Sequence, residues 1–190
     1  MNQTSFFICK QMGIGDLVIL IANIHAISKS INSKLIVLAQ KNTRANEVLM
    51  HDPHVEEVID LDKKGFLNII KKIKNKNCQK SYIYSDSLRL YLISKLSNIK
   101  ENYQYRLFSK KGKNFFKTAK KFTEEILNCE INHESKIYWD PKEVEKAKKI
   151  FNISTETKNI VCGVSASGYT KIYPIKNYIK LFEIINNKFP

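Results

Sequence analysis

Phe6-Phe7-Ile8-Cys9, followed by Gly13-Ile14-Gly15-Asp16 and the apolar stretch from Leu17 to Ile27, is the part of the sequence that best indicates the architecture of this chain. The first stretch indicates a buried strand, and the last indicates a helix. Gly13 and Gly15 allow a tight turn and the close approach of a ligand to the backbone. Asp16 is then expected in the first helical turn, at the carboxyl edge of the sheet, where open α/β folds bind ligands. Helix capping is the simpler interpretation of its position alone.

The following residues alternate between strand-like and helix-like stretches. Strands are predicted at 6–10, 34–38, 57–61 and 82–84, and helices at 16–30, 45–51, 65–74 and 88–96. Short connections in such a series indicate an α/β fold, with a Rossmann-like parallel sheet that is flanked by helices. Residues 101–113 are aromatic and basic without a clear period, so we interpret them as a long loop or a short strand near the sheet edge. A further helix is predicted over 114–127.

The C-terminal part of the chain begins with a helix signal. Asp140-Pro141-Lys142-Glu143 has a capping Asp, a proline at the first helical position and a Glu three residues after the cap. A strand at 159–164, a loop at 165–174 and a helix at 175–188 should follow. We therefore expect a first domain at 1–152, a linker at 153–158, and only the start of a second Rossmann-like domain at 159–190, too short to bury a core alone.

The positive charge of the chain is concentrated in its centre. Between Lys63 and Lys121 there are 17 basic and 2 acidic residues, whereas the remainder has 15 basic and 16 acidic, and the net charge is +14. A one-sided positive field attracts nucleic acid, anionic lipid head groups or an acidic saccharide. A solvated lysine face with no partner explains the composition equally well.

Composition narrows the class of protein. With 190 residues, of which 43% are hydrophobic, the chain is long enough to bury a core. No apolar run approaches the roughly 20 residues that cross a bilayer, and the N-terminus lacks the features of a signal peptide, so we expect a cytoplasmic protein. The 4 cysteines and 4 histidines show no metal-ligand spacing, so no metal is predicted.

Three stretches carry a family resemblance: Phe7 to Val18; Asp52-Pro53-His54-Val55-Glu56-Glu57-Val58-Ile59; and Gly163-Val164-Ser165-Ala166-Ser167 with Lys171-Ile172-Tyr173-Pro174. In this order and at these separations, they resemble the glycosyltransferase family 9 heptosyltransferases, which add heptose to the lipopolysaccharide inner core. The resemblance implies a GT-B architecture, in which two Rossmann-like domains face each other across a cleft. The first would bind the acceptor and the second the nucleotide-sugar.

The resemblance also implies roles for matching residues. Asp16 would be the general base that takes a proton from the acceptor hydroxyl. Lys171 would neutralise the donor diphosphate as it leaves, and hydroxyls and backbone amides of the same loop would help to hold it, with Ser165, Ser167 and Thr170 as candidates. This chemistry is consistent with glycosyl transfer, because an alcohol needs a base near neutral pH and a departing diphosphate needs fixed positive charge.

Four residues are candidates for binding the acceptor: Gly13, Gly15, Asp86 and Arg89. The last two follow the predicted strand at 82–84, at the same sheet edge as Asp16, although a surface ion pair between residues three apart is the more ordinary explanation for them. The donor would be a nucleotide-sugar such as ADP-heptose, and the acceptor an acidic lipopolysaccharide core or another glycan. No cofactor is expected.

The chain departs from the family most clearly in length, since family members continue far beyond this point with residues that hold most donor contacts. We therefore expect a heptosyltransferase-type enzyme that, as this truncated chain, requires a C-terminal half for activity. Two alternatives stay open. One is a non-catalytic domain that binds an anionic saccharide or a membrane surface, with peripheral contact at the cytoplasmic face of the inner membrane. The less favoured one is a nucleic-acid-binding protein.

Overall fold

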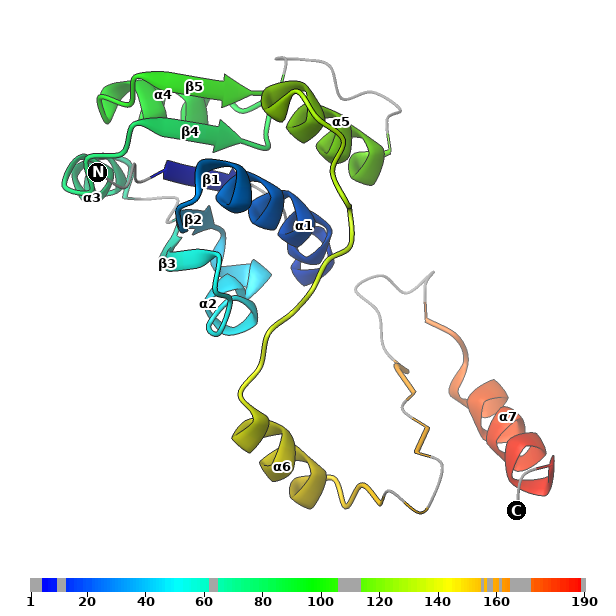
Figure 1. Cartoon of the computed structure of the whole chain (residues 1–190). Coiled ribbons are helices and arrows are strands. Elements are labelled where there is room, and N and C mark those ends of the chain that lie inside the picture. Colours follow the sequence, from blue (N-terminus) through cyan, green and yellow to red (C-terminus); the bar gives the residue numbers. More distant parts are fainter. Residues whose placement is uncertain are drawn as a thin grey trace. The chain divides into compact units, whose positions relative to one another are not determined.

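A computed structural model describes residues 5–9, 13–61, 65–105, 114–154, 156, 159–160, 162–164 and 172–188 (Figure 1). Contacts between residues divide the chain into two compact units, Met1–Pro141 and Lys142–Pro190. The linker and domain boundaries proposed from the sequence stay a prediction.

The described residues of the first unit form a five-stranded parallel sheet in the order β3-β2-β1-β4-β5. Its strands are β1 Ser5–Cys9, β2 Leu35–Ala39, β3 Val55–Asp60, β4 Lys80–Ile83 and β5 Glu101–Gln104. All residues of the interior strand β2 are buried, as expected where helices cover both faces of a parallel sheet. The α/β, Rossmann-like prediction is therefore confirmed. β5 is the short edge strand that was one of two options for this region.

Helices cover both faces of the sheet (Figure 1). On one face, α1 Ile14–Ile31 contacts α5 Phe115–Leu127, and on the other, α3 Phe66–Lys74 contacts α4 Leu88–Leu96. The connection between β2 and β3 holds the short helices η1 Lys41–Thr43 and α2 Ala45–Val48. This arrangement follows from right-handed crossovers between parallel strands.

The core has two layers, one on each face of the sheet. Along β1, Phe7 belongs to the cluster that α1 and α5 cover, whereas Phe6 and Ile8 belong to the cluster that α3 and α4 cover. Successive side chains of a strand point to opposite faces, which explains this division. Both clusters consist of buried residues, so both helix layers are held by apolar burial.

Helix α1 differs from one sequence expectation. By length and composition, it is the one described helix that could cross a membrane. Half of its apolar window is buried within the protein, and Leu20, Ile24 and Ile27 belong to the core cluster between α1 and the sheet. We therefore interpret α1 as a core helix.

Asparagines close several helices and turns in the left-handed conformation. α1 ends at Asn32 (φ 48°) and α5 at Asn128 (φ 52°), and the other asparagines with positive φ are Asn77, Asn98 and Asn152. Glycine is the usual residue at such positions, but the sequence has only 6 glycines. Asparagine tolerates the conformation better than most residues because its short side chain can form local hydrogen bonds.

The second unit contains α6 Pro141–Ile150 and α7 Ile175–Lys188, and neither helix has a buried residue. The predicted strand at 159–164 is not observed in the described part of that range, 159–160 and 162–164. A strand is stabilised by hydrogen bonds to a neighbouring strand, and the described residues of this unit include no strand that could pair with this stretch. In the described residues of this stretch, the apolar pattern alone is therefore not sufficient for a strand.

Candidate functional site

Asp16 lies in the first turn of α1, as the sequence predicts. The helix begins at Ile14, and its N-cap is Gly13, so Asp16 is the third helical residue and makes no capping hydrogen bond. The Asp16 side chain is partly exposed, and no described residue pairs with its carboxylate. A negative charge is favourable at a helix N-terminus. The Asp16 carboxylate thus lies at the carboxyl edge of β1, and no described residue forms an ion pair or hydrogen bond with it.

Gly13 and Gly15 depart from the expected turn geometry. Gly13 is extended, with φ −150° and ψ 170°, and Gly15 lies inside α1, so neither requires a conformation reserved for glycine. A Cβ added to either residue would meet no atom within 4 Å. The described backbone is therefore open at this turn, which fits the predicted close approach of a ligand.

Asp86 and Arg89 follow β4, which pairs with β1 in parallel. The segments after these two strands lie at the same edge of the sheet, so the structure brings Asp86 and Asp16 to one edge. Arg89 is the second residue of α4, and its guanidinium carbon lies 5.9 Å from the ring centroid of Phe66 on α3. Arg89 therefore also contacts the neighbouring helix through a cation–π interaction.

The candidates for binding the donor phosphates lie outside the described residues: Ser165, Ser167, Thr170 and Lys171. The residues on either side of them are described. The Tyr178 hydroxyl, on α7, donates a hydrogen bond to the Gly163 carbonyl at 3.2 Å, and the Tyr173 ring meets the Tyr178 ring edge-on at 5.2 Å. Tyr178 thus contacts both sides of the predicted donor loop, a role that the sequence pattern did not suggest.

The opposite, amino edge of the sheet holds a cluster that sequence reasoning missed. His25 Nε2 lies 2.7 Å from Asp52 Oδ2, and both side chains are buried. The rings of His25 and His54 are 4.5 Å apart, and His54 Nδ1 lies 3.1 Å from Ser28 Oγ. Burial lowers the pKa of His54, and repulsion from His25 lowers this pKa further.

The topology explains why these residues meet. α1 runs from the carboxyl edge to the amino edge, so His25 and Ser28 reach the edge where β3 begins, directly after Asp52-Pro53-His54. Spacing within a single element could not reveal this contact between elements, whereas the predicted parallel order could have. Among the described residues, no group of three or more His, Cys, Asp or Glu is placed to hold a metal ion.

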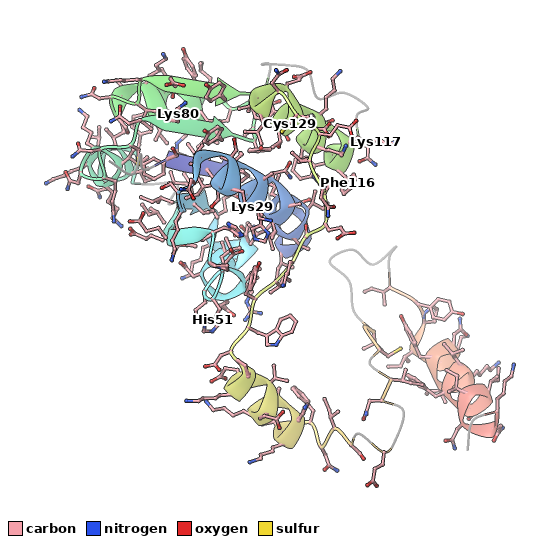
Figure 2. The ribbon with its side chains drawn as sticks, viewed as in Figure 1. Lys29, His51, Lys80, Phe116, Lys117 and Cys129 are labelled. Atoms are coloured by element: carbon pink, nitrogen blue, oxygen red, sulfur yellow. The ribbon has the colours of Figure 1, made fainter. Side chains whose placement is uncertain are left out.

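A cavity of about 590 Å³ adjoins this cluster, between α1 and the segment after α5. Lys29 on α1 and Cys129 after α5, both labelled in Figure 2, are among its lining residues. The Tyr138 ring, which also lines the cavity, meets the His25 ring edge-on at 5.8 Å. This cavity and Asp16 lie at opposite ends of α1, so it does not belong to the Asp16 site.

A buried polar network connects the segment at 128–140 to α1. The Tyr84 hydroxyl lies 2.6 Å from Thr123 Oγ1, which donates to Asn23 Oδ1 at 2.6 Å. Asn23 Nδ2 lies 3.0 Å from His133 Nε2. An amide nitrogen only donates, so His133 Nε2 accepts and its ring is neutral. Burial, as the main cause, lowers the pKa of His133 accordingly.

No protein-family model and no curated protein matches the chain. Solved structures do match, and two of them are glycosyltransferases. The Escherichia coli ADP-heptose lipopolysaccharide heptosyltransferase II matches with a TM-score of 0.74 and 14% identity, over 98% of this chain and 62% of that one. A glycosyl transferase family 9 protein from Veillonella parvula DSM 2008 matches with a TM-score of 0.74 and 12% identity, over 97% of this chain and 60% of that one.

The chain thus spans about 60% of the length of these two structures. At such low identity, the likeness establishes the fold, and it agrees with the architecture that the sequence resemblance implied. The chain shares an α/β, Rossmann-like fold with two solved structures of glycosyltransferases.

Proposed function

We propose that this chain is the acceptor-binding part of a glycosyltransferase of the heptosyltransferase type. The donor is a nucleotide-sugar such as ADP-heptose, and the acceptor is an acidic lipopolysaccharide core or another glycan. Two independent lines support this: the three sequence motifs, and the fold shared with two glycosyltransferases. The observation that carries the proposal is the position of Asp16, in the first turn of α1 at the carboxyl edge of the sheet.

In the proposed reaction, the acceptor hydroxyl attacks the anomeric carbon of the donor sugar. The Asp16 carboxylate takes the hydroxyl proton, a contribution of about 10²- to 10⁴-fold in rate for a positioned base. The bond between the anomeric carbon and the diphosphate breaks, and the diphosphate leaves with the electron pair. Lys171 stabilises the negative charge of this leaving group, with Ser165, Ser167 and Thr170 as further contacts.

The acceptor site is proposed at the carboxyl edge of β1 and β4. The open backbone at Gly13 and Gly15 admits a sugar close to Asp16, because added side chains there would meet no described atom within 4 Å. Asp86, in the connection after β4, and Arg89, at the start of α4, would contact the acceptor from the same edge of the sheet. The basic central block would attract an acceptor that carries carboxylates or phosphates.

We further propose that the protein acts in the cytoplasm, at the cytoplasmic face of the inner membrane. The second unit would be the start of the nucleotide-sugar domain, so transfer would require a further nucleotide-binding half. The assignment of the second unit is supported by the share of the two matching structures that the chain spans, which is 62% and 60%. A nucleic-acid partner is not proposed.

The substitution Asp16→Asn tests the proposal. Sugar transfer from ADP-heptose to an inner-core acceptor would be measured with the chain alone and with a separately expressed nucleotide-binding half. We expect Asp16→Asn to lower kcat by about 10²- to 10⁴-fold with little change in the acceptor KM, because the base is lost while binding remains.

Asp60→Asn is the matched control for this experiment. Asp60 ends β3 at the same edge of the sheet, is exposed, and accepts a hydrogen bond from Asn46 at 3.1 Å. Transfer by the Asp60→Asn variant should stay within about twofold of wild type. Unchanged transfer by Asp16→Asn would contradict the role of the base. No transfer in either arrangement would favour a non-catalytic binding domain.

A further inference from the structure

We propose that the outer surface of α3 and α4, here called the α3–α4 face, docks on an anionic phospholipid bilayer. The two helices lie side by side over one face of the sheet and bury their inner residues in the same core cluster (Figure 1). The contact of Arg89 on α4 with the Phe66 ring on α3 joins them near their N-terminal ends. Their exposed side chains therefore form one continuous surface.

Leucines project from this face into solvent. On α4, Leu88, Leu92 and Leu96 recur every four residues and are 58%, 42% and 50% exposed. Leu67, on α3, is 75% exposed. Residues four apart lie on one side of a helix, so the α4 leucines form a stripe opposite the buried residues Leu90 and Ile93. Single exposed leucines are ordinary, whereas a stripe on adjoining helices marks an interaction surface.

Both helices carry positive charge from lysines close to these leucines. Residues 65–100 contain 8 basic residues and a single acidic one, Asp86, and neither helix contains an acidic residue. Lys71, Lys74 and Lys95 are exposed and form no ion pair with any residue that the structure describes. By contrast, the basic residues between the two helices, Lys76 and Lys80, pair with Glu57 and Glu101.

The combination of aliphatic side chains and uncompensated lysines matches the surface of an anionic bilayer. Leucines enter the boundary between head groups and acyl chains, and lysines bind the anionic head groups. A second copy of the same face would bring equal positive charges together. Single-stranded nucleic acid prefers exposed aromatic platforms, but the aromatic residues of these helices, Phe66 and Tyr91, are half-buried and contact Arg89 and Lys95.

Both helices begin at the carboxyl edge of the sheet, so Leu67 and Leu88 lie near the edge that holds Asp16. A docked protein would hold that edge close to the membrane, within reach of a lipid-anchored acceptor. Only this last step rests on the proposed transferase function. Docking itself depends on the α3–α4 face alone and is tested without any sugar transfer.

The first test uses the wild-type chain and sedimentation with vesicles. We expect binding to vesicles of phosphatidylcholine and phosphatidylglycerol in equal parts, at least about tenfold above binding to phosphatidylcholine alone. Added salt should weaken binding, because it screens the lysines. Equal binding to both vesicle types, or binding to neither, would overturn the proposal. Stronger binding to single-stranded nucleic acid than to anionic vesicles would also overturn it.

Two variants locate the surface. Lys71→Gln/Lys74→Gln/Lys95→Gln should weaken vesicle binding by about 100-fold, at roughly fivefold for each lysine near the bilayer. Leu88→Asn/Leu92→Asn should weaken it by about tenfold, through lost insertion of apolar side chains. All five side chains are exposed, so the thermal midpoint and circular dichroism spectrum should match those of wild type.

Matched controls come from the second unit. Lys149→Gln/Lys180→Gln/Lys188→Gln removes the same charge from exposed positions, and Ile179→Asn/Ile184→Asn changes residues that are 53% and 62% exposed. Both controls should bind vesicles within about twofold of wild type, because they leave the α3–α4 face unchanged. A loss of binding in the controls equal to that in the α3–α4 variants would overturn the assignment of this face.

Discussion

The two units of this chain place similar apolar residues in opposite environments. In the first unit, Phe7, Ile24 and Val37 are 0% exposed, whereas in the second unit Ile150, Phe151 and Ile184 are 76%, 73% and 62% exposed. The first unit has a sheet against which its helices pack, and the described part of the second has none. An amphipathic pattern therefore forms a helix in both units, but burial requires a second layer of structure.

Local interactions suffice to explain the helix α6 in the second unit. It starts with proline at the first helical position, and Lys146 and Lys148 lie 2.6 Å and 2.8 Å from Glu143 and Glu145. Exposed ion pairs of this kind each contribute a few tenths of a kcal/mol. Local interactions therefore explain the helix α6 of the second unit, whereas the helices of the first unit also depend on packing against the sheet.

The largest expected difference concerns an aromatic residue in each unit. Phe7→Ala removes a buried ring that stacks on Tyr84 at 4.4 Å, so the free energy of unfolding of the first unit should fall by about 3–5 kcal/mol. Phe151→Ala, at an exposed position, should change it by less than about 0.5 kcal/mol. Urea unfolding followed by circular dichroism measures both. Similar losses of free energy of unfolding in the two variants would show that Phe151 is also buried in a hydrophobic core.

Loss of a polar contact should also destabilise the first unit more than the second, but by less than the loss of the Phe7 ring. Asn23→Ala removes one hydrogen bond of Thr123 Oγ1 and the described partner of His133 Nε2 in a buried network, so we expect a loss of about 1–3 kcal/mol in the free energy of unfolding. Tyr178→Phe removes an exposed hydrogen bond to Gly163 and should cost less than about 1 kcal/mol. If Asn23→Ala lowered the free energy of unfolding by no more than Tyr178→Phe, the buried network would not stabilise the first unit more than an exposed hydrogen bond does.

The smallest expected effect is a pH dependence confined to the first unit, which contains all 4 histidines. Burial lowers the pKa of both His54 and His133 in the folded protein. The unfolded chain therefore binds more protons below about pH 6.5, so the free energy of unfolding should fall as the pH falls from 8 toward 5.

His54→Gln combined with His133→Gln tests this dependence. Thermal unfolding should become less sensitive to pH between about 5 and 8, because neither side chain can then take up a proton. His51→Gln changes an exposed histidine in the same unit and serves as the control. An unaltered pH profile in the double variant would assign the dependence to other groups.

Several elements could be predicted from the sequence because local signals set them. The bounds of α4 and α7 agree with the prediction, since each is a periodic stretch between polar or proline residues. The helix predicted at 45–51 is shorter, as α2 ends at Val48. The chain turns before Pro53 because the Asp52 carboxylate accepts a hydrogen bond from the His54 backbone and contacts His25, an interaction between distant residues.

The same distinction holds for the candidate site. The position of Asp16 followed from one rule, that a loop after a parallel strand reaches the carboxyl edge, and it is confirmed. The cluster of His25, Asp52 and His54 depends on contacts between elements, so local spacing did not predict it. The role of Lys171 stays a prediction, because this residue lies outside the described part of the chain.

The left-handed asparagines at the ends of α1 and α5 have a practical consequence. Each carries a Cβ where the backbone favours none, so Asn32→Gly and Asn128→Gly would relieve crowding without touching the core. Asn32 lies at the end of α1 that is opposite Asp16. Asn128 ends α5, which covers the face of the sheet opposite α3 and α4. These substitutions should give a more stable protein for crystallisation and binding studies, and they leave the Asp16 site and the α3–α4 face unchanged.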